Sequence, residues 1–169
     1  MTINVRPARP EDAPQMVDLL NRIIEIGGTT AHQTRMTVER MMDHYLAPKL
    51  LISCVVAVKG ADLLGFQSLE WSDHNPSDPH SRPADWAYIA SFVKDGQQGK
   101  GIGSQLFKAT SAAAKAKGVT AINATIRADN PSGLAFYGRM GFREEDRIVA
   151  VPLTDGTPVD RIRKIYQIF

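Results

Sequence analysis

The sequence predicts an α/β fold in which a mixed sheet carries helices on both faces. Segments with apolar residues every three or four positions alternate with short apolar runs of the β type, so helices and strands alternate along the chain. The chain has 169 residues, 43% of them hydrophobic, which is enough to bury one core. No internal repeat or low-complexity tail interrupts the pattern. We therefore expect residues 1–169 to form a single domain.

The first elements are a strand and two helices. A short strand is expected over residues 3–7, and apolar residues at helical spacing then predict a helix that opens near Pro10 and stops at Gly27. Thr37 is a suitable cap for a second helix, which extends to about Tyr45.

A β-hairpin and a long loop follow. The runs LISCVVAV and LLGFQSLEW, joined by KGAD, are typical of two strands with a tight turn between them. Residues 72–85 contain three prolines and almost nothing apolar, which indicates a surface loop before a strand over 86–94. Loops of this length often carry function.

The second half continues the alternation and ends in a pair of strands. An alanine-rich helix is expected from Ile102 to Lys117, where Gly118 ends it. Pro131 is well placed in the first turn of another short helix, which ends before Gly141. The other expected elements are strands over 119–126, 142–151 and 161–169, the last two pairing across TDGTP.

Charge and cysteine content exclude several classes of protein. The chain has 20 basic and 18 acidic residues without a basic run, so we expect no nucleic-acid partner. No segment resembles a signal peptide or a membrane span, and we expect a cytoplasmic protein. The single cysteine, Cys54, fits a reducing compartment and a buried position. Because the histidines are dispersed and no zinc spacing exists, we also expect no metal.

The segment DGQQGKGIGSQLF, residues 95–107, leaves its backbone unusually bare. Gly99, Gly101 and Gly103 lie just before and in the first turn of the expected helix, so a ligand can approach the N–H groups there. A helix N-terminus favours an anion such as phosphate, and Lys100 adds positive charge. The segment is not a dinucleotide fingerprint, because position 106 is leucine, and it is not a P-loop, because Lys100 precedes glycine.

The pattern Gln98-x-x-Gly101-x-Gly103, after a strand and at the start of a helix, resembles the pyrophosphate-binding motif of the GNAT superfamily of N-acetyltransferases. A second segment, about 30 residues later, resembles the family's Asn, Ala-x-Tyr and Gly-Phe signature. It comprises Asn130, Ala135-Phe136-Tyr137 and Gly141-Phe142. Together with the late strands, the resemblance covers essentially the whole chain. It implies a mostly antiparallel central sheet with one splayed strand pair, and acetyl-coenzyme A (acetyl-CoA) as co-substrate.

The resemblance also implies which residues bind the coenzyme. Backbone N–H groups from Gln98 to Ser104 would hold the pyrophosphate, and the backbone of two strand residues would pair with the pantetheine arm. Asn130 would contact the coenzyme, cap its helix, or do both. The full predicted coenzyme set is Phe92, Val93, Gln98, Gly99, Lys100, Gly101, Ile102, Gly103, Ser104, Asn130 and Tyr137.

The chemistry of acetyl transfer requires two proton movements. The amine must lose a proton before it attacks the thioester, and the departing thiolate, with a pKa of about 8.5, benefits from a proton donor. Tyr137 stands where many GNAT members carry this general acid. The alternative is that its ring only packs against Gly141-Phe142.

The sequence looks most similar to phosphinothricin-type and other small-amine acetyltransferases, with one departure. Those proteins often carry a glutamate five residues before the position of Val93, and this chain has Tyr88 there. We therefore predict Glu70 as the catalytic base, with Asp73, His74 and Asp85 as weaker alternatives, each acting directly or through water.

The acceptor pocket is expected between residues 27–34 and the residues that lead into the loop 72–85. Thr29 and Thr30, with His32, would bind a carboxylate or hydroxyl of the acceptor, and Tyr88 would orient its amine. We predict transfer to a primary amine of a small molecule, an amino acid or its analogue. The alternatives are an acyl-CoA-binding module without turnover and a protein or peptide acetyltransferase. We expect a homodimer, because relatives commonly form one.

Overall fold

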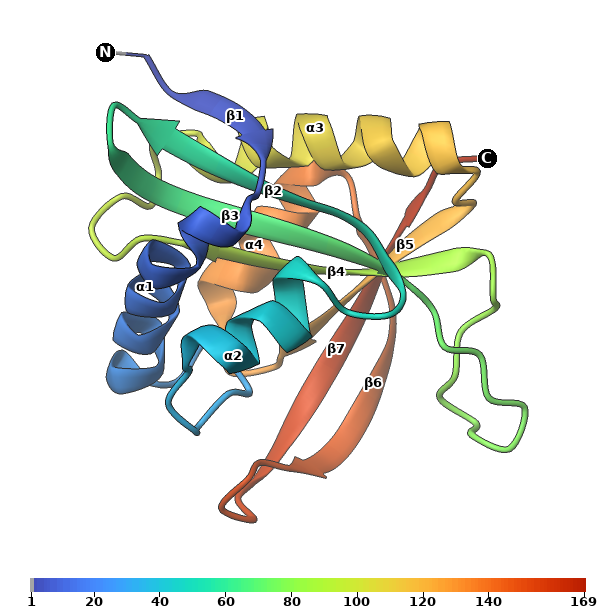
Figure 1. Cartoon of the computed structure of the whole chain (residues 1–169). Coiled ribbons are helices and arrows are strands. Elements are labelled where there is room, and N and C mark those ends of the chain that lie inside the picture. Colours follow the sequence, from blue (N-terminus) through green and yellow to red (C-terminus); the bar gives the residue numbers. More distant parts are fainter. Residues whose placement is uncertain (1) are drawn as a thin grey trace.

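A single seven-stranded sheet organises the chain, in the order β1-β2-β3-β4-β5-β7-β6 (Figure 1). The computed structural model describes residues 2–169. The strands are β1 (Asn4–Pro7), β2 (Leu51–Lys59), β3 (Asp62–Trp71), β4 (Trp86–Val93), β5 (Ala121–Arg127), β6 (Arg143–Pro152) and β7 (Pro158–Gln167). The helices are α1 (Ala13–Ile26), α2 (Val38–Met41), α3 (Ile102–Lys117) and α4 (Pro131–Met140).

Both expected N-terminal helices form, with irregular turns at their ends. A 3₁₀ turn, Pro10–Asp12, precedes α1 because the Asp12 carboxylate accepts a hydrogen bond from the Arg9 N–H at 2.8 Å and pairs with Arg6 at 2.8 Å. After α2 the chain continues as a π-helical turn, Met42–Leu46, rather than as the single regular helix expected. This turn buries the ring of Tyr45 against Phe66 and Phe92.

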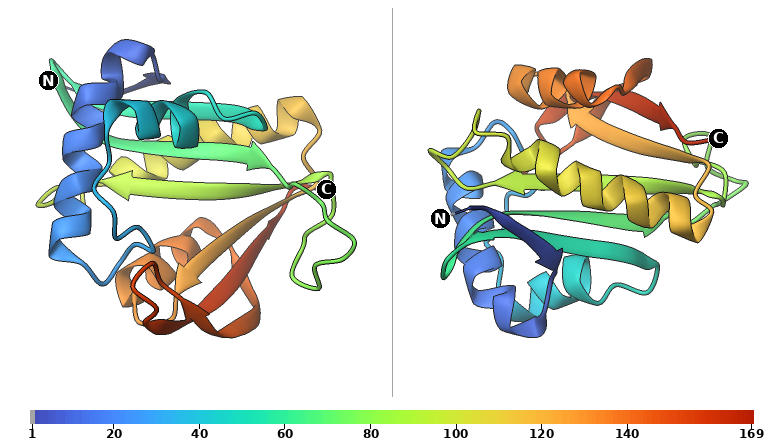
Figure 2. Two further views of the ribbon diagram at one scale, coloured as in Figure 1. Left: turned by 60° about the horizontal axis from the view of Figure 1, so that its bottom comes forward. Right: turned by 90° about the horizontal axis from the view of Figure 1, so that it is seen from above.

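Helices cover both faces of the sheet. One core cluster joins α1 and α2 to β2 and β3, and it includes Met16, Leu20 and Phe66. On the opposite face α3 packs on β2 and β3 through Ile102 and Leu106, and α4 lies over β5 and β7 (Figure 2). The sequence-predicted arrangement of helices on both faces is confirmed.

The sheet opens between β4 and β5. These strands are parallel and pair only through Trp86–Tyr88 and Ala121–Asn123, beyond which they diverge (Figure 2). Every other neighbouring pair is antiparallel. The expected mixed, mostly antiparallel sheet with a splayed strand pair is therefore confirmed.

The C-terminal strands form an antiparallel pair, as predicted. The terminal segment RIRKIYQIF lies inside the sheet, between β5 and β6, so it covers the chain's own sheet rather than offering an edge to a neighbour. The exposed edge at this end is β6. Among residues 2–169 no helix has both the length and the apolar character needed to cross a membrane.

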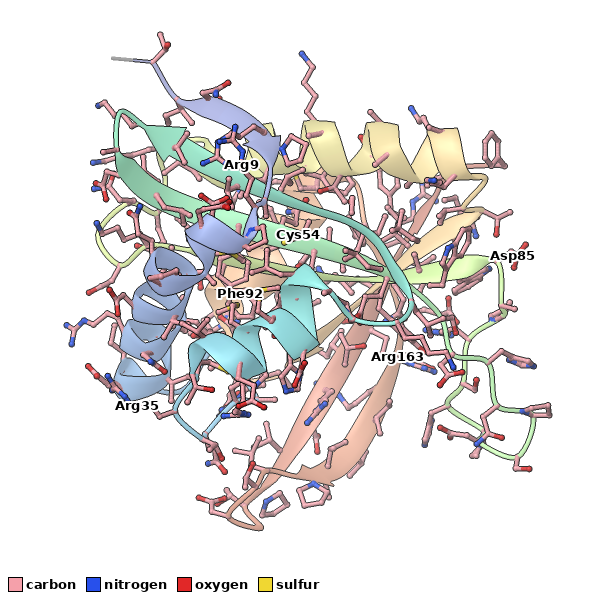
Figure 3. The ribbon with its side chains drawn as sticks, in the orientation of Figure 1. Arg9, Arg35, Cys54, Asp85, Phe92 and Arg163 are labelled. Atoms are coloured by element: carbon pink, nitrogen blue, oxygen red, sulfur yellow. The ribbon has the colours of Figure 1, made fainter. Side chains whose placement is uncertain are left out.

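The loop 72–85 is fixed against this C-terminal pair. Arg82 donates to the Asn123 side-chain oxygen at 2.9 Å and to Glu145 at 2.7 Å. Arg163, beside the loop in Figure 3, donates to the main-chain oxygen of His80 at 2.7 Å and pairs with Asp146. These bonds hold the loop at the end of the sheet where β4 begins.

Candidate active site

A cleft of about 770 Å³ occupies the gap where β4 and β5 diverge. One wall, here called the coenzyme wall, comprises the end of β4, the glycine loop 97–104 and α4. The other, here called the acceptor wall, comprises residues 29–32, Tyr45, the end of β5 and Arg161 of β7. The two walls meet along β4, so a ligand on one wall can contact a ligand on the other.

The glycine loop leaves backbone donors open to the cleft. Gly99 and Gly101 both have φ of 79°, a conformation that costs any other residue about 1–2 kcal/mol. No side chain caps the first turn of α3, so its N–H groups are available to an anion. Gly103 is needed for packing, because a Cβ there would lie 2.5 Å from the Phe136 ring on α4. The loop thus has the shape of a phosphate site.

Gln98 holds the loop in this shape. Its side chain donates to the Val93 carbonyl oxygen at 3.3 Å and accepts from the Gly96 N–H at 3.0 Å. Every residue of the predicted coenzyme set lines the cleft except Lys100, which is exposed and contacts Gln97 at 3.3 Å.

Asn130 ties the two walls together. Its side-chain oxygen caps α4 by accepting from the Gly133 N–H at 3.0 Å and from the Ser132 hydroxyl at 3.1 Å. Its side-chain nitrogen donates to the Thr29 carbonyl at 3.2 Å. The capping role considered from the sequence is therefore present, and the residue also lines the cleft.

Tyr137 reaches the cleft from α4 and is buried. Its hydroxyl lies 2.9 Å from the Ser91 hydroxyl on β4, which accepts a hydrogen bond from the fully buried Gln67 at 2.9 Å. Burial raises the pKa of Tyr137 to about 12, although the bond to Ser91 lowers it. The ring also packs on Phe142, with centroids 5.1 Å apart, so packing and exposure to the cleft coexist.

The loop after α1 closes the acceptor wall by crossing to the far side of the opening (Figure 2). The Thr30 carbonyl accepts from Arg127 at 3.0 Å, and the Thr30 hydroxyl accepts from the His32 N–H at 3.1 Å. The His32 ring lies 2.5 Å from the Tyr45 hydroxyl. Burial, with the charges of His44 and Arg40, lowers the pKa of His32.

The residues predicted to accept the amine's proton, or to orient the amine, do not line the cleft. Glu70 lies opposite Tyr88 on β3, and Tyr88 is the last residue of β4 that pairs with β5. Burial raises the pKa of Glu70. Asp85 stands before β4, roughly 25 Å along the strand from the glycine loop, and Figure 3 shows it far from Phe92.

The residues that lead into the loop 72–85, which were expected to wall the acceptor pocket, do not line the cleft. The loop itself does not line it either, because the bonds of Arg82 and Arg163 hold the loop at the other end of the sheet. Asp73 and His74 share this position at the end of β3.

Sequence reasoning did not single out three of the residues that line the cleft: Ser91, Arg127 and Arg161. A signal existed for the last of them. Alternation in the final strand places Arg161 and Arg163 on one face, which is unusual for an interior strand of a sheet.

A model of the acetyltransferase (GNAT) family matches residues 16–142, which is most of the chain. The chain belongs to this family. Membership makes it an acyltransferase that uses acetyl-CoA as co-substrate, and it confirms the family recognised from the glycine and Asn130 motifs. Within residues 2–169 no three His, Cys, Asp or Glu side chains are grouped so that they could hold a metal ion.

Solved acetyltransferase structures share the fold over most or all of their length. An N-acetyltransferase from Staphylococcus aureus Mu50 is 20% identical, with a TM-score of 0.80 and complete coverage of both chains. The putative acetyltransferase yncA from Salmonella typhimurium, solved with its cofactor acetyl-CoA, is 18% identical with a TM-score of 0.82, covering 100% of this chain and 95% of the other. A phosphinothricin acetyltransferase from Sinorhizobium meliloti, in complex with AcCoA, is 18% identical with a TM-score of 0.81, covering 99% and 89%. No curated protein matches the sequence.

Proposed function

We propose that this GNAT protein moves an acetyl group from acetyl-CoA to the primary amine of a small molecule, an amino acid or its analogue, by direct attack in a ternary complex. The observation that carries the proposal is the continuous cleft, which joins a glycine loop suited to bind phosphate to a second, polar wall. A route through an acylated cysteine is not supported, because Cys54 is buried in the core behind α1 and α2. Burial there raises the pKa of its thiol to about 12, so the nucleophilic thiolate is scarce.

The coenzyme would lie along the coenzyme wall. N–H groups between Gln98 and Ser104 would bind the diphosphate. Beyond Tyr88, β4 has no partner on the side of β5, so its backbone groups there are free to pair with pantetheine amides near Phe92 and Val93. This arrangement would hold the thioester at the base of the opening, beside Tyr137.

Tyr137 would protonate the departing thiolate. A pKa of about 12 keeps its hydroxyl protonated throughout the neutral range, as a general acid requires. Holding both reactants in line within the cleft would supply much of the remaining acceleration.

Removal of the amine's proton would use a different route. No carboxylate lines the cleft among residues 2–169, so Glu70 would act only through intervening water. Its raised pKa makes it a stronger base than an ordinary carboxylate. His32 lines the acceptor wall, and its lowered pKa keeps it neutral at pH 7, so it is the second candidate for this proton.

The deciding experiment measures release of coenzyme A from acetyl-CoA in the presence of amino acids, other small amines and peptides. We expect turnover above background with at least one small amine. Binding of acetyl-CoA without turnover on any amine would instead favour an acyl-CoA-binding module, and a strong preference for peptides would favour a protein or peptide acetyltransferase.

We also propose that the protein is a cytoplasmic homodimer. The buried, unpaired Cys54 is compatible with a reducing compartment, and the edge strand β6 carries Val149, which is 69% exposed. Light scattering at several protein concentrations would test the dimer, and a mass of one chain throughout would rule it out.

A further inference from the structure

Two arginines face each other on the acceptor wall. Arg127 at the end of β5 and Arg161 on β7 are directly paired across the two strands, and both line the cleft. Residues paired in this way share one face of the sheet, and like charges so placed repel each other. A negatively charged group near the two arginines would therefore stabilise the pair.

Arg127 has a negatively charged partner within the chain. Asp129 accepts two hydrogen bonds from its guanidinium, at 2.9 and 2.8 Å, and the Thr30 carbonyl accepts a third at 3.0 Å. The Asp129 carboxylate neutralises the charge of Arg127. The bond from Arg127 to the Thr30 carbonyl holds the loop after α1.

Arg161 has no such partner among residues 2–169. None of the ion pairs among residues 2–169 includes it, and its Nε is buried without a hydrogen-bond acceptor. Burial and the neighbouring charge of Arg127 lower the pKa of Arg161, which means that its charged form is destabilised in the folded protein. A buried donor without a partner destabilises the fold, so a compensating acceptor is expected.

Arg163, two residues along the same strand, shows how this chain treats a structural arginine. It lies on the same face as Arg161, pairs with Asp146 through two nitrogens, and donates a further bond to the His80 carbonyl. The contrast indicates that the charge of Arg161 is not used to hold the fold.

The coenzyme's diphosphate is not the natural partner. Ile126 and Ile162, the adjacent cross-strand pair, point to the opposite face, where Ile126 packs in the cluster that contains Tyr137 of α4. Because side chains alternate along a strand, Arg161 projects to the face away from α4. Its counter-ion is therefore expected on the acceptor side.

We propose that Arg161 binds an anionic group of the acceptor, so that the substrates of this enzyme are amines that carry a carboxylate or a similarly shaped phosphonate or phosphinate. The inference rests on the proposed function and narrows its substrate class. A guanidinium binds such groups through two parallel hydrogen bonds. The buried Nε of Arg161 lacks an acceptor, and none of the ion pairs among residues 2–169 includes its terminal nitrogens. Within the described residues no carboxylate lines the cleft, so none there competes with the acceptor for this charge.

The test compares α-amino acids with their carboxamides as acceptors, for the wild type and for Arg161→Gln. We expect the wild type to prefer the acids, and the variant to lose about 10- to 100-fold in kcat/KM for them while the amides and the KM for acetyl-CoA change little. Arg161→Lys should recover part of the loss. Arg147→Gln, which removes an exposed positive charge of β6, is the matched control and should behave as the wild type.

Three kinetic results would each overturn the proposal: equal use of acids and amides by the wild type, an equal loss on both classes in Arg161→Gln, or a rise confined to the KM for acetyl-CoA. Calorimetry with the same acids, on protein saturated with coenzyme A, separates this failure from that of the proposed function. Binding that depends on Arg161 without any turnover would retain the anion site and reject the transferase. Absence of binding and turnover with every acid would reject the anion site. Circular dichroism checks that each variant is folded.

Discussion

The two walls of the cleft are built in different ways. The coenzyme wall depends on backbone: glycines with positive φ, the open first turn of α3 and the unpaired side of β4. The acceptor wall depends on side chains from segments far apart in the chain, such as Asn130 bound to Thr29 and Arg127 bound to Thr30. The first kind of wall follows from local sequence rules, and the second does not.

We therefore expect the coenzyme wall to bind the acetyl donor and the acceptor wall to select the acceptor. The family model ends at residue 142, so it includes the whole coenzyme wall but not β7, which carries Arg161. Binding of a common donor requires a constant backbone shape, whereas discrimination among acceptors requires charges that can vary on the same scaffold. Substitutions on the two walls should therefore alter different kinetic constants.

The largest effect is expected from Tyr137 of α4, whose hydroxyl lies beside Ser91 of β4. Tyr137→Phe removes the proposed proton donor and should lower kcat by about 10²-fold or more, with little change in either KM. Steady-state kinetics on a good acceptor would measure it. Tyr166→Phe removes the same atom from a ring that packs on Phe142 outside the cleft, and it should leave kcat unchanged. An unaltered rate and pH profile in Tyr137→Phe would reject the donor role.

A smaller effect is expected from the backbone of the coenzyme wall. Gly101 and Gly118 flank α3 with φ of 79° and 80°, and an added Cβ would meet nothing within 4 Å at either position. Alanine at each site should cost about 1–2 kcal/mol of stability. Only Gly101→Ala should also weaken binding of acetyl-CoA, by about 5- to 30-fold, because the strain shifts the N–H groups that face the cleft.

Calorimetry and thermal unfolding on this pair separate binding from stability. Equal coenzyme affinity in both variants would show that the glycine loop does not hold the ligand. The acceptor constants should follow the wild type in both, since Thr30 and Arg127 lie on the other wall.

Periodicity in the sequence predicted the helices and strands, and the resemblance of two short motifs to the GNAT family implied the splayed strand pair and the residues of the coenzyme wall. For the acceptor wall the sequence indicated residues 27–34, of which 29–32 line the cleft, but it did not indicate Arg127 and Arg161. The residues that lead into the loop 72–85 were also expected there, but the long-range bonds of Arg82 and Arg163 hold that loop at the other end of the sheet. Arg127 and Arg161 are 34 residues apart and become neighbours only through the register of β5 and β7.

Ser91 offers a finer test of how the walls cooperate. Its bond lowers the pKa of Tyr137, so Ser91→Ala should raise that pKa further and make the phenol a poorer donor. We expect kcat to fall by about 2- to 10-fold with the KM for acetyl-CoA nearly unchanged, as for loss of one neutral hydrogen bond. The control is Ser68→Ala, which removes a buried hydroxyl on β3, one position from Gln67 and opposite Ala90. A change in KM without a change in kcat would contradict this positioning role.

The smallest effect concerns stability and lies entirely on the acceptor wall. Burial and the nearby charges of His44 and Arg40 lower the pKa of His32 below the value of about 6.5 expected in the unfolded chain. Between these two pKa values the unfolded chain binds more protons than the folded one, so the free energy of unfolding decreases as the pH falls below about 6.5. His32→Gln should therefore reduce the loss of thermal stability between pH 7 and pH 5. Thermal unfolding at several pH values measures the difference, and parallel curves for the wild type and His32→Gln would mean that His32 becomes protonated as readily in the folded wall as in the unfolded chain.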